Sequence, residues 1–179
     1  MERLSVVEYL SMRYLNEREF QRLLPYDADI VERVKFLLQR QKDRQRKEIQ
    51  RNRIKEHIYK IEIERIEWLL SEYLLIRMEK IRNNFYIKDE SILSPHEKEY
   101  YRAYINLNKE VGAYVELEDI PERHRNKEDL PEIHGVYALD NLQDISIDGE
   151  ILTLSPGEFL IGNISTSEDL VNDLGVLLV

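Results

Sequence analysis

The segment from Ile66 to Ile81 constrains the fold more than any other part of this 179-residue sequence. Its apolar residues would cover most of the circumference of a helix, which is the pattern of a helix buried on nearly all sides. Charged residues at five positions within it exclude a membrane span. A domain of this size cannot bury such a helix alone. We therefore expect other subunits to cover it, because obligate interfaces resemble a domain core cut in two.

Apolar residues at helical spacing predict four helices in the first 117 residues. We expect them over Ser5 to Leu24, from Asp27 onward, from about Glu48 to Phe85, and from Ser94 to about Leu117. The third of these helices carries two apolar stripes, so two of its faces should be covered. The first stripe holds Ile54, Ile58 and Ile61, and the second holds Ile63, Ile66, Leu70, Tyr73 and Leu74.

Local signals refine the helix starts and faces. Asp27 is a good N-cap residue, and Ser94 with Glu97 forms a capping box around Pro95. The second helix should bury an apolar face that includes Phe36. We expect a break near residues 43–48, because nothing in that stretch can anchor a core.

From residue 134 onward, short apolar runs separated by turn residues predict β strands. They lie at 136–139, 145–147, 151–154, 159–161 and 175–179. A hairpin turn is expected at Asp148-Gly149, and a short helix is expected to begin with a capping box of Ser165 and Glu168. The small size of this unit predicts that it docks on another surface. The fold class is therefore mainly α, with a helical bundle domain over 1–117, a linker over 118–133 and a small β-rich domain over 134–179.

Motifs for catalysis, cofactors or metals are lacking in the sequence, so we expect no enzyme. There is no cysteine, and the six glycines form neither a phosphate-binding loop nor a dinucleotide fingerprint. Glu62, Glu64 and Glu67 predict ion pairs rather than an acid/base site, and Trp68 predicts a core or interface anchor. Tyrosines expected in a core or interface rather than stacked on bases are Tyr100, Tyr101, Tyr104 and Tyr114.

The stretch from Lys35 to Lys60 carries ten basic and three acidic residues, a local net charge of +7 in a chain of net charge -9. It should project into solvent or face an acidic partner. Residues expected to contact DNA or such a partner are Arg44, Arg46, Lys47 and Arg51. A stand-alone helical nucleic-acid-binding protein using residues 35–60 is the alternative function. The overall acidity argues against a surface built mainly for DNA.

Three parts of the chain resemble the GINS family of DNA replication proteins. The run from Ile61 to Ile81 is similar to the family's signature helix, and Leu93 to Glu97 is similar to the start of its next helix. Leu15 to Glu17, followed by Asp29 to Glu32, resembles the subunit called Sld-five, as does the order of helical domain and β domain. The signature positions are Glu62, Glu64, Arg65, Ile66, Leu70, Tyr73, Leu74, Arg77, Lys80 and Ile81.

The resemblance implies a structural subunit that assembles with three other GINS subunits. That heterotetramer joins the MCM ring and the Cdc-forty-five protein in the replicative DNA helicase at initiation and elongation, with a contact to DNA polymerase epsilon through the complex. The expected location is nuclear, or cytoplasmic if the source is archaeal, without a membrane partner. Expected core and interface residues are Glu64, Arg65, Ile66, Trp68, Leu70, Tyr73, Leu74, Arg77, Ile81, Val176, Leu177 and Leu178.

Overall fold

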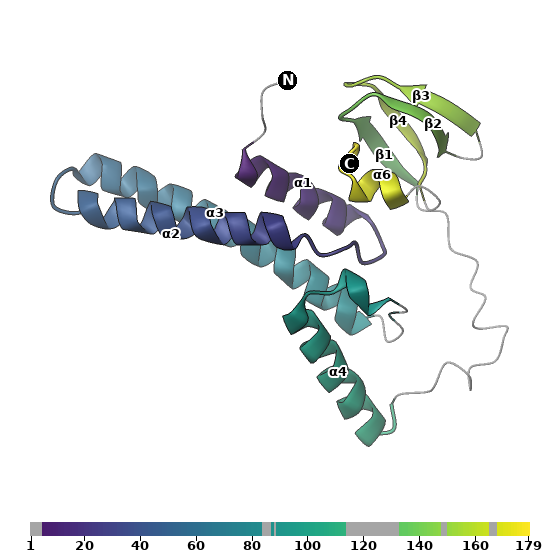
Figure 1. Ribbon diagram of the computed structural model, residues 1–179, viewed down its shortest axis with the longest axis horizontal. Helices are drawn as coiled ribbons and strands as arrows, with labels where there is room; N and C mark the ends of the chain where they lie inside the picture. The colour runs from purple at the N-terminus through teal and green to yellow at the C-terminus, as the bar shows by residue number, and fades with distance from the viewer. Residues whose placement is uncertain (1–4, 84–86, 88, 114–132, 148–149, 165–167) are drawn as a thin grey trace. The chain divides into compact units, whose positions relative to one another are not determined.

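The computed structural model describes residues 5–83, 87, 89–113, 133–147, 150–164 and 168–179 (Figure 1). An N-terminal helical region precedes a small C-terminal domain of antiparallel strands. The chain is 61% helical and 17% strand, which confirms the mainly α class. The helices of the N-terminal region are α1 (Val6–Glu19), α2 (Ala28–Glu48), α3 (Arg53–Asn83), the 3-10 helix η1 (Glu90–Ile92) and α4 (Pro95–Glu110).

Capping residues fix several of these helix starts. The Asp27 side chain accepts a hydrogen bond from the Ile30 amide at the start of α2. Ser94 and Glu97 form the predicted capping box of α4, with Pro95 at its first position. α4 ends at Glu110, with Val111 as its C-cap residue, rather than at about Leu117 as expected.

Two further helix boundaries differ from the sequence expectation. α1 ends at Glu19 rather than Leu24. α2 continues without a break through residues 43–48, and the turn lies at residues 49–52 instead. The side-chain oxygen of Asn52 accepts hydrogen bonds from the amides of Ile54 and Lys55, at 3.0 and 3.1 Å. This N-cap interaction starts α3 at Arg53 and explains the position of the turn.

The C-terminal domain contains two small antiparallel sheets. The three-stranded sheet has the order β4-β1-β5, and the β2-β3 hairpin forms the other. Val136 of β1 pairs with Leu160 of β4 and with Leu178 of β5. The predicted turn at Asp148-Gly149 and the predicted cap Ser165 lie outside the described residues. The elements are β1 (Ile133–Ala138), β2 (Leu142–Ile147), β3 (Glu150–Leu154), β4 (Phe159–Asn163), α6 (Glu168–Asn172) and β5 (Val176–Leu178).

The chain forms two compact units that cut across the boundaries predicted from the sequence. The first unit comprises residues 1–14 and 27–76, and the second comprises residues 15–26 and 77–179. In the first unit, α2 and α3 run antiparallel, side by side (Figure 1). Lys42 of α2 contacts Glu67 of α3 at 2.6 Å. The buried apolar residues of this unit are Val7, Leu10, Ile30, Val31, Val34, Leu38, Ile63, Ile66, Leu69 and Tyr73.

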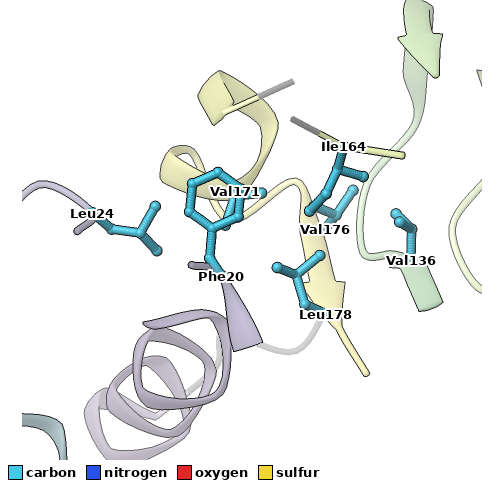
Figure 2. Packing of buried hydrophobic residues seen from close by; sticks show 7 residues of the cluster. All are labelled: Phe20, Leu24, Val136, Ile164, Val171, Val176 and Leu178. Carbon is cyan, nitrogen blue, oxygen red and sulfur yellow. The ribbon is translucent and has the colours of Figure 1, made fainter. Parts of the chain in front are cut away.

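In the second unit, the residues that follow α1 pack against the β domain. Figure 2 shows the Phe20 ring beside Val171 of α6, with Val176 and Leu178 of β5 in the same cluster. The exposed fractions of Phe20 and Leu24 are 0% and 2%. The β domain thus docks on its own chain, which supplies the support that so small a unit needs. A separate cluster joins Leu23, Ile81, Leu93 and Tyr101.

Candidate functional site

One face of α3 exposes large apolar side chains along most of its length in the first unit. Ile58 and Ile61 are 60% and 53% exposed, and Trp68 is 56% exposed. The spacing alternates between four and three residues, as in the seam of a coiled coil, with Arg65 and Glu72 at the intervening positions. We call this surface the α3 stripe: Ile54, Ile58, Ile61, Trp68 and Leu75.

A different face of the same helix is covered. Ile63, Ile66, Leu69 and Tyr73 are buried, with exposed fractions of 6% or less. Because residues three and four apart share a helix face, these four side chains form a separate stripe from the exposed one. α3 is therefore apolar on two faces, and within the described residues only one of them is buried. The Trp68 ring makes an edge-to-face contact with Tyr14, at 6.1 Å between ring centroids, but stays largely exposed.

Glu62, Glu64 and Glu67 of α3 form surface ion pairs. Arg65 donates two hydrogen bonds to Glu62, at 2.8 and 3.2 Å. These bonds lower the pKa of the Glu62 carboxyl below its ordinary value and raise the pKa of Arg65. Glu64 lies 3.9 Å from Lys60, and Glu67 pairs with Lys42. The Glu62 carboxylate is thus partly neutralised by Arg65, which disfavours the protonated form that a general acid requires.

Arg77 forms the centre of a buried polar cluster in the second unit. Its guanidinium binds Glu97 through two hydrogen bonds, at 2.8 and 3.2 Å, and Glu17 at 3.0 Å. It also donates to the carbonyl oxygens of Leu24 and Ile92. All five guanidinium N–H groups therefore have an acceptor, although Arg77 is 0% exposed.

Lys80 adds a second cation to the cluster. Its Nζ donates to the Glu17 carboxylate at 2.8 Å, and it also binds the backbone carbonyls of Glu17 and Arg22. Two carboxylates thus face two cations, with Glu97 also accepting the Ser94 amide of the capping box. The cluster is charge-balanced, so its geometry is that of a structural centre.

Asn16 covers the outer edge of β5. Its side-chain amide donates to the Val176 carbonyl at 3.0 Å, and its oxygen accepts from the Leu178 amide at 3.0 Å. The side chain therefore bonds the strand in the way that a neighbouring strand would. Val176 and Leu178 are 1% exposed in the core beside Phe20, and only Leu177 remains half-buried. Val176, Leu177 and Leu178 were expected to contact neighbouring subunits. Val176 and Leu178 are instead buried within the chain.

The other predicted interface residues divide by burial. Ile66, Tyr73, Arg77 and Ile81 are buried, whereas Leu70 and Leu74 are half-buried. The residues that remain exposed are Glu64, Arg65 and Trp68, so the structure does not place Trp68 in a core of this chain. Of the tyrosines expected in a core or interface, Tyr101 is buried and Tyr100 stacks on Tyr104, while Tyr114 lies outside the described residues.

The predicted basic residues Arg44, Arg46, Lys47 and Arg51 are all exposed. Arg46 forms an ion pair with Asp43 at 3.4 Å, which distinguishes it from the other three.

Sequence reasoning missed the partners of Arg77 and misplaced Phe36. Asn16, Glu17 and Glu97 carried no local sign of burial, since polar residues at helix ends are ordinarily exposed. Phe36 is 72% exposed rather than part of the buried face of α2. Helical spacing could have predicted this exposure. Phe36 lies two residues from both Val34 and Leu38, which places it on the opposite side of the helix.

No protein-family model matches the sequence, and no curated protein matches it either. None of the helices within the described ranges is long and apolar enough to cross a bilayer. Within the same ranges, no three His, Asp or Glu side chains gather closely enough to hold a metal ion.

Proposed function

We propose that the chain is a structural, non-catalytic subunit of a hetero-oligomer, and that the α3 stripe is its main subunit interface. The observation that carries the proposal is the exposure of Ile54, Ile58, Ile61, Trp68 and Leu75 at coiled-coil spacing on a 31-residue helix. Large apolar side chains exposed together on one helix face mark protein–protein interaction sites. The alternation of three and four residues fits a helix of another subunit.

The assembly that we propose is of the GINS type. Support comes from the three segments that carry the resemblance, because residues from each meet at Arg77: Glu17 from the first, Arg77 and Lys80 from the signature helix, and Glu97 from the last. Similar motif residues are expected in related chains when they build a shared structural centre. Under this proposal the partners are three other GINS subunits, the MCM ring and the Cdc-forty-five protein, with polymerase epsilon reached through the complex. The location would be nuclear, or cytoplasmic in an archaeal source.

The first experiment is co-expression with the three other candidate GINS subunits of the same organism, followed by light scattering of the purified product. We expect a 1:1:1:1 complex, while the chain alone self-associates through its exposed stripe. A lone chain that remains a monomer and ignores the other subunits would exclude the proposal.

Variants of the stripe test which surface makes the contact. Ile58→Asp with Ile61→Asp places two charges in the proposed interface and should prevent assembly. The matched control is Lys55→Asp with Lys60→Asp, which alters exposed polar positions in the same part of α3. Leu70 and Leu74 are less suitable because they are half-buried within the chain, so their substitution would also disturb its fold. Assembly that survives the stripe variant would exclude the α3 stripe as the interface.

The second candidate function is nucleic-acid binding through residues 35–60, supported by the exposure of Arg44, Lys47 and Arg51. The net charge of -9 opposes it, because an acidic molecule repels a polyanion at long range. A duplex-binding titration at low and high salt separates the two functions, since phosphate contacts weaken steeply with salt.

A further inference from the structure

The cations of α2 differ in their ion pairing. Four of them form ion pairs within the chain, whereas Arg40, Arg44, Lys47 and the following Arg51 form none with any residue that the structure describes. The spacing of four and three residues places Arg40, Arg44 and Lys47 on one face of α2, and Arg51 lies in the turn that follows the helix. We call them the basic stripe. The paired cations are Arg33 with Asp29, Lys35 with Glu32, Lys42 with Glu67, and Arg46 with Asp43.

Phe36 extends the basic stripe by one helical turn. It precedes Arg40 by four residues and is 72% exposed. A surface hollow of about 430 Å³ lies among Phe36, Gln39, Arg40, Asp43, Arg44 and Lys47. The Asp43 carboxylate accepts hydrogen bonds from Gln39 and from Arg46 outside the hollow, so part of its charge is already neutralised. The hollow therefore combines an exposed aromatic ring with three cations that form no ion pair among the described residues.

We propose that this face binds an acidic protein segment that inserts one apolar side chain beside Phe36. Residues from Phe36 to Lys47 span about 17 Å at about 1.5 Å per residue. Carboxylates spaced by one helical turn would meet Arg40, Arg44 and Lys47 in succession. Arginine, which this face presents at positions 40 and 44, is one of the residues in which protein interfaces concentrate their binding energy.

A protein segment fits this face better than a nucleic acid. Single-stranded nucleic acids are bound by several aromatic side chains interleaved with cations, whereas the basic stripe has one aromatic residue, at its end. The chain as a whole is acidic, which weakens attraction to a long polyanion but leaves a short-range match to a few carboxylates intact. The inference uses a different surface from the α3 stripe and does not depend on the proposed function.

The test is fluorescence anisotropy with the purified full chain, at a concentration where light scattering gives a single species. The probe is a fluorescein-labelled peptide of about four helical turns. It carries three Glu residues separated by four and then three positions, and one Leu four positions before the first Glu. A peptide of the same composition in scrambled order is the control. We expect saturable binding of the first peptide that weakens with added salt, and weaker binding of the scrambled one.

Matched variants locate the binding face. Arg40→Glu with Arg44→Glu should weaken binding roughly tenfold or more, since two attractions become repulsions. Arg53→Glu with Lys55→Glu makes the same change in net charge at exposed positions of α3 and should leave binding within about twofold. Phe36→Ser should weaken binding without any change of charge. Far-UV circular dichroism shows whether each variant keeps its helices.

The contrary outcomes are equally definite. Equal binding by both double variants, or equal binding of the scrambled peptide, would exclude the basic stripe as the site. Unchanged affinity in Phe36→Ser would exclude the apolar anchor. A labelled duplex or single-stranded DNA that binds more tightly than the peptide, and loses affinity in Arg40→Glu with Arg44→Glu, would replace the acidic segment with nucleic acid.

Discussion

The Arg77 cluster and the α3 stripe distribute charge and apolar surface in opposite ways. Around Arg77, four charged side chains are buried or nearly so, and every guanidinium donor has an acceptor. Along the α3 stripe, large apolar side chains lie in water. The first region is complete within the chain, whereas the second is the surface that we propose another subunit covers. The comparison therefore contrasts a region that serves the chain's own fold with one that carries the proposal of a partner.

The largest expected effect comes from breaking the Arg77 cluster. Arg77→Met leaves Glu97 buried without its cation and Glu17 with Lys80 alone. We expect the free energy of unfolding to fall by about 3–5 kcal/mol, because a buried charge that loses its partner is strongly unfavourable. Urea denaturation followed by circular dichroism measures the change. Arg65→Met removes an exposed ion pair and should cost about 1 kcal/mol or less; similar losses in both variants would contradict the contrast.

A smaller effect is expected at the edge of β5. Asn16→Ala removes both side-chain hydrogen bonds to the strand and leaves the Val176 carbonyl and the Leu178 amide unpaired in a buried setting. The expected cost is about 1–3 kcal/mol. Hydrogen exchange at the Leu178 amide should accelerate accordingly. Asn106→Ala, at an exposed position of α4, is the control; equal exchange rates in the two variants would show that Asn16 does not hold the strand.

The α3 stripe should tolerate substitutions in the isolated chain. Ile58→Asp with Ile61→Asp should alter the free energy of unfolding by only about 0.5 kcal/mol, since both side chains are already exposed. Urea denaturation monitored by Trp68 fluorescence measures it. A loss comparable to that of Arg77→Met would mean that the α3 stripe supports the chain's own fold, and would remove the distinction between the two regions.

The smallest expected effect concerns pH. Because the folded pKa of Glu62 lies below its ordinary value, the Glu62–Arg65 pair contributes stability above the ordinary pKa of Glu, about 4.3. That contribution is lost as the pH falls through the lowered value. The pair is exposed, so the loss should be about 0.5 kcal/mol or less. Comparing Glu62→Gln with the parent chain between about pH 7 and pH 3 isolates it; identical pH profiles would contradict the assignment.

Helical periodicity predicted the helical region and the two apolar stripes of α3, local signals predicted the α4 capping box, and short apolar runs between turn residues predicted the β domain. Periodicity predicted less well where local signals compete with packing. Residues 20–24 continue the apolar pattern of α1 but leave the helix, because Phe20 and Leu24 pack against the β domain instead. The turn after α2 depends on the Asn52 cap, which lies within a run of basic residues that offered no other anchor.

The Arg77 cluster could not be predicted from residues that are close together in the sequence. Arg77 pairs with Glu17, 60 residues away, and with Glu97, 20 residues away. Nothing near Arg77 in sequence distinguishes it from an exposed arginine except its position on the buried side of α3. The resemblance to GINS proteins selected Arg77 as a core or contact residue, but it did not supply the partners. Those follow only from the three-dimensional arrangement of the second unit.

The hydrogen bond between Asn16 and Leu178 spans 162 residues of sequence, which bears on how the protein is made. At about 5–20 residues per second, roughly 8 to 32 s of translation separate the two residues on a ribosome. Phe20 and Asn16 emerge early and wait with their side chains exposed until β5 is synthesised. The second unit must therefore close after residue 178 is made, as a slow, long-range step that leaves the nascent chain dependent on protection from aggregation.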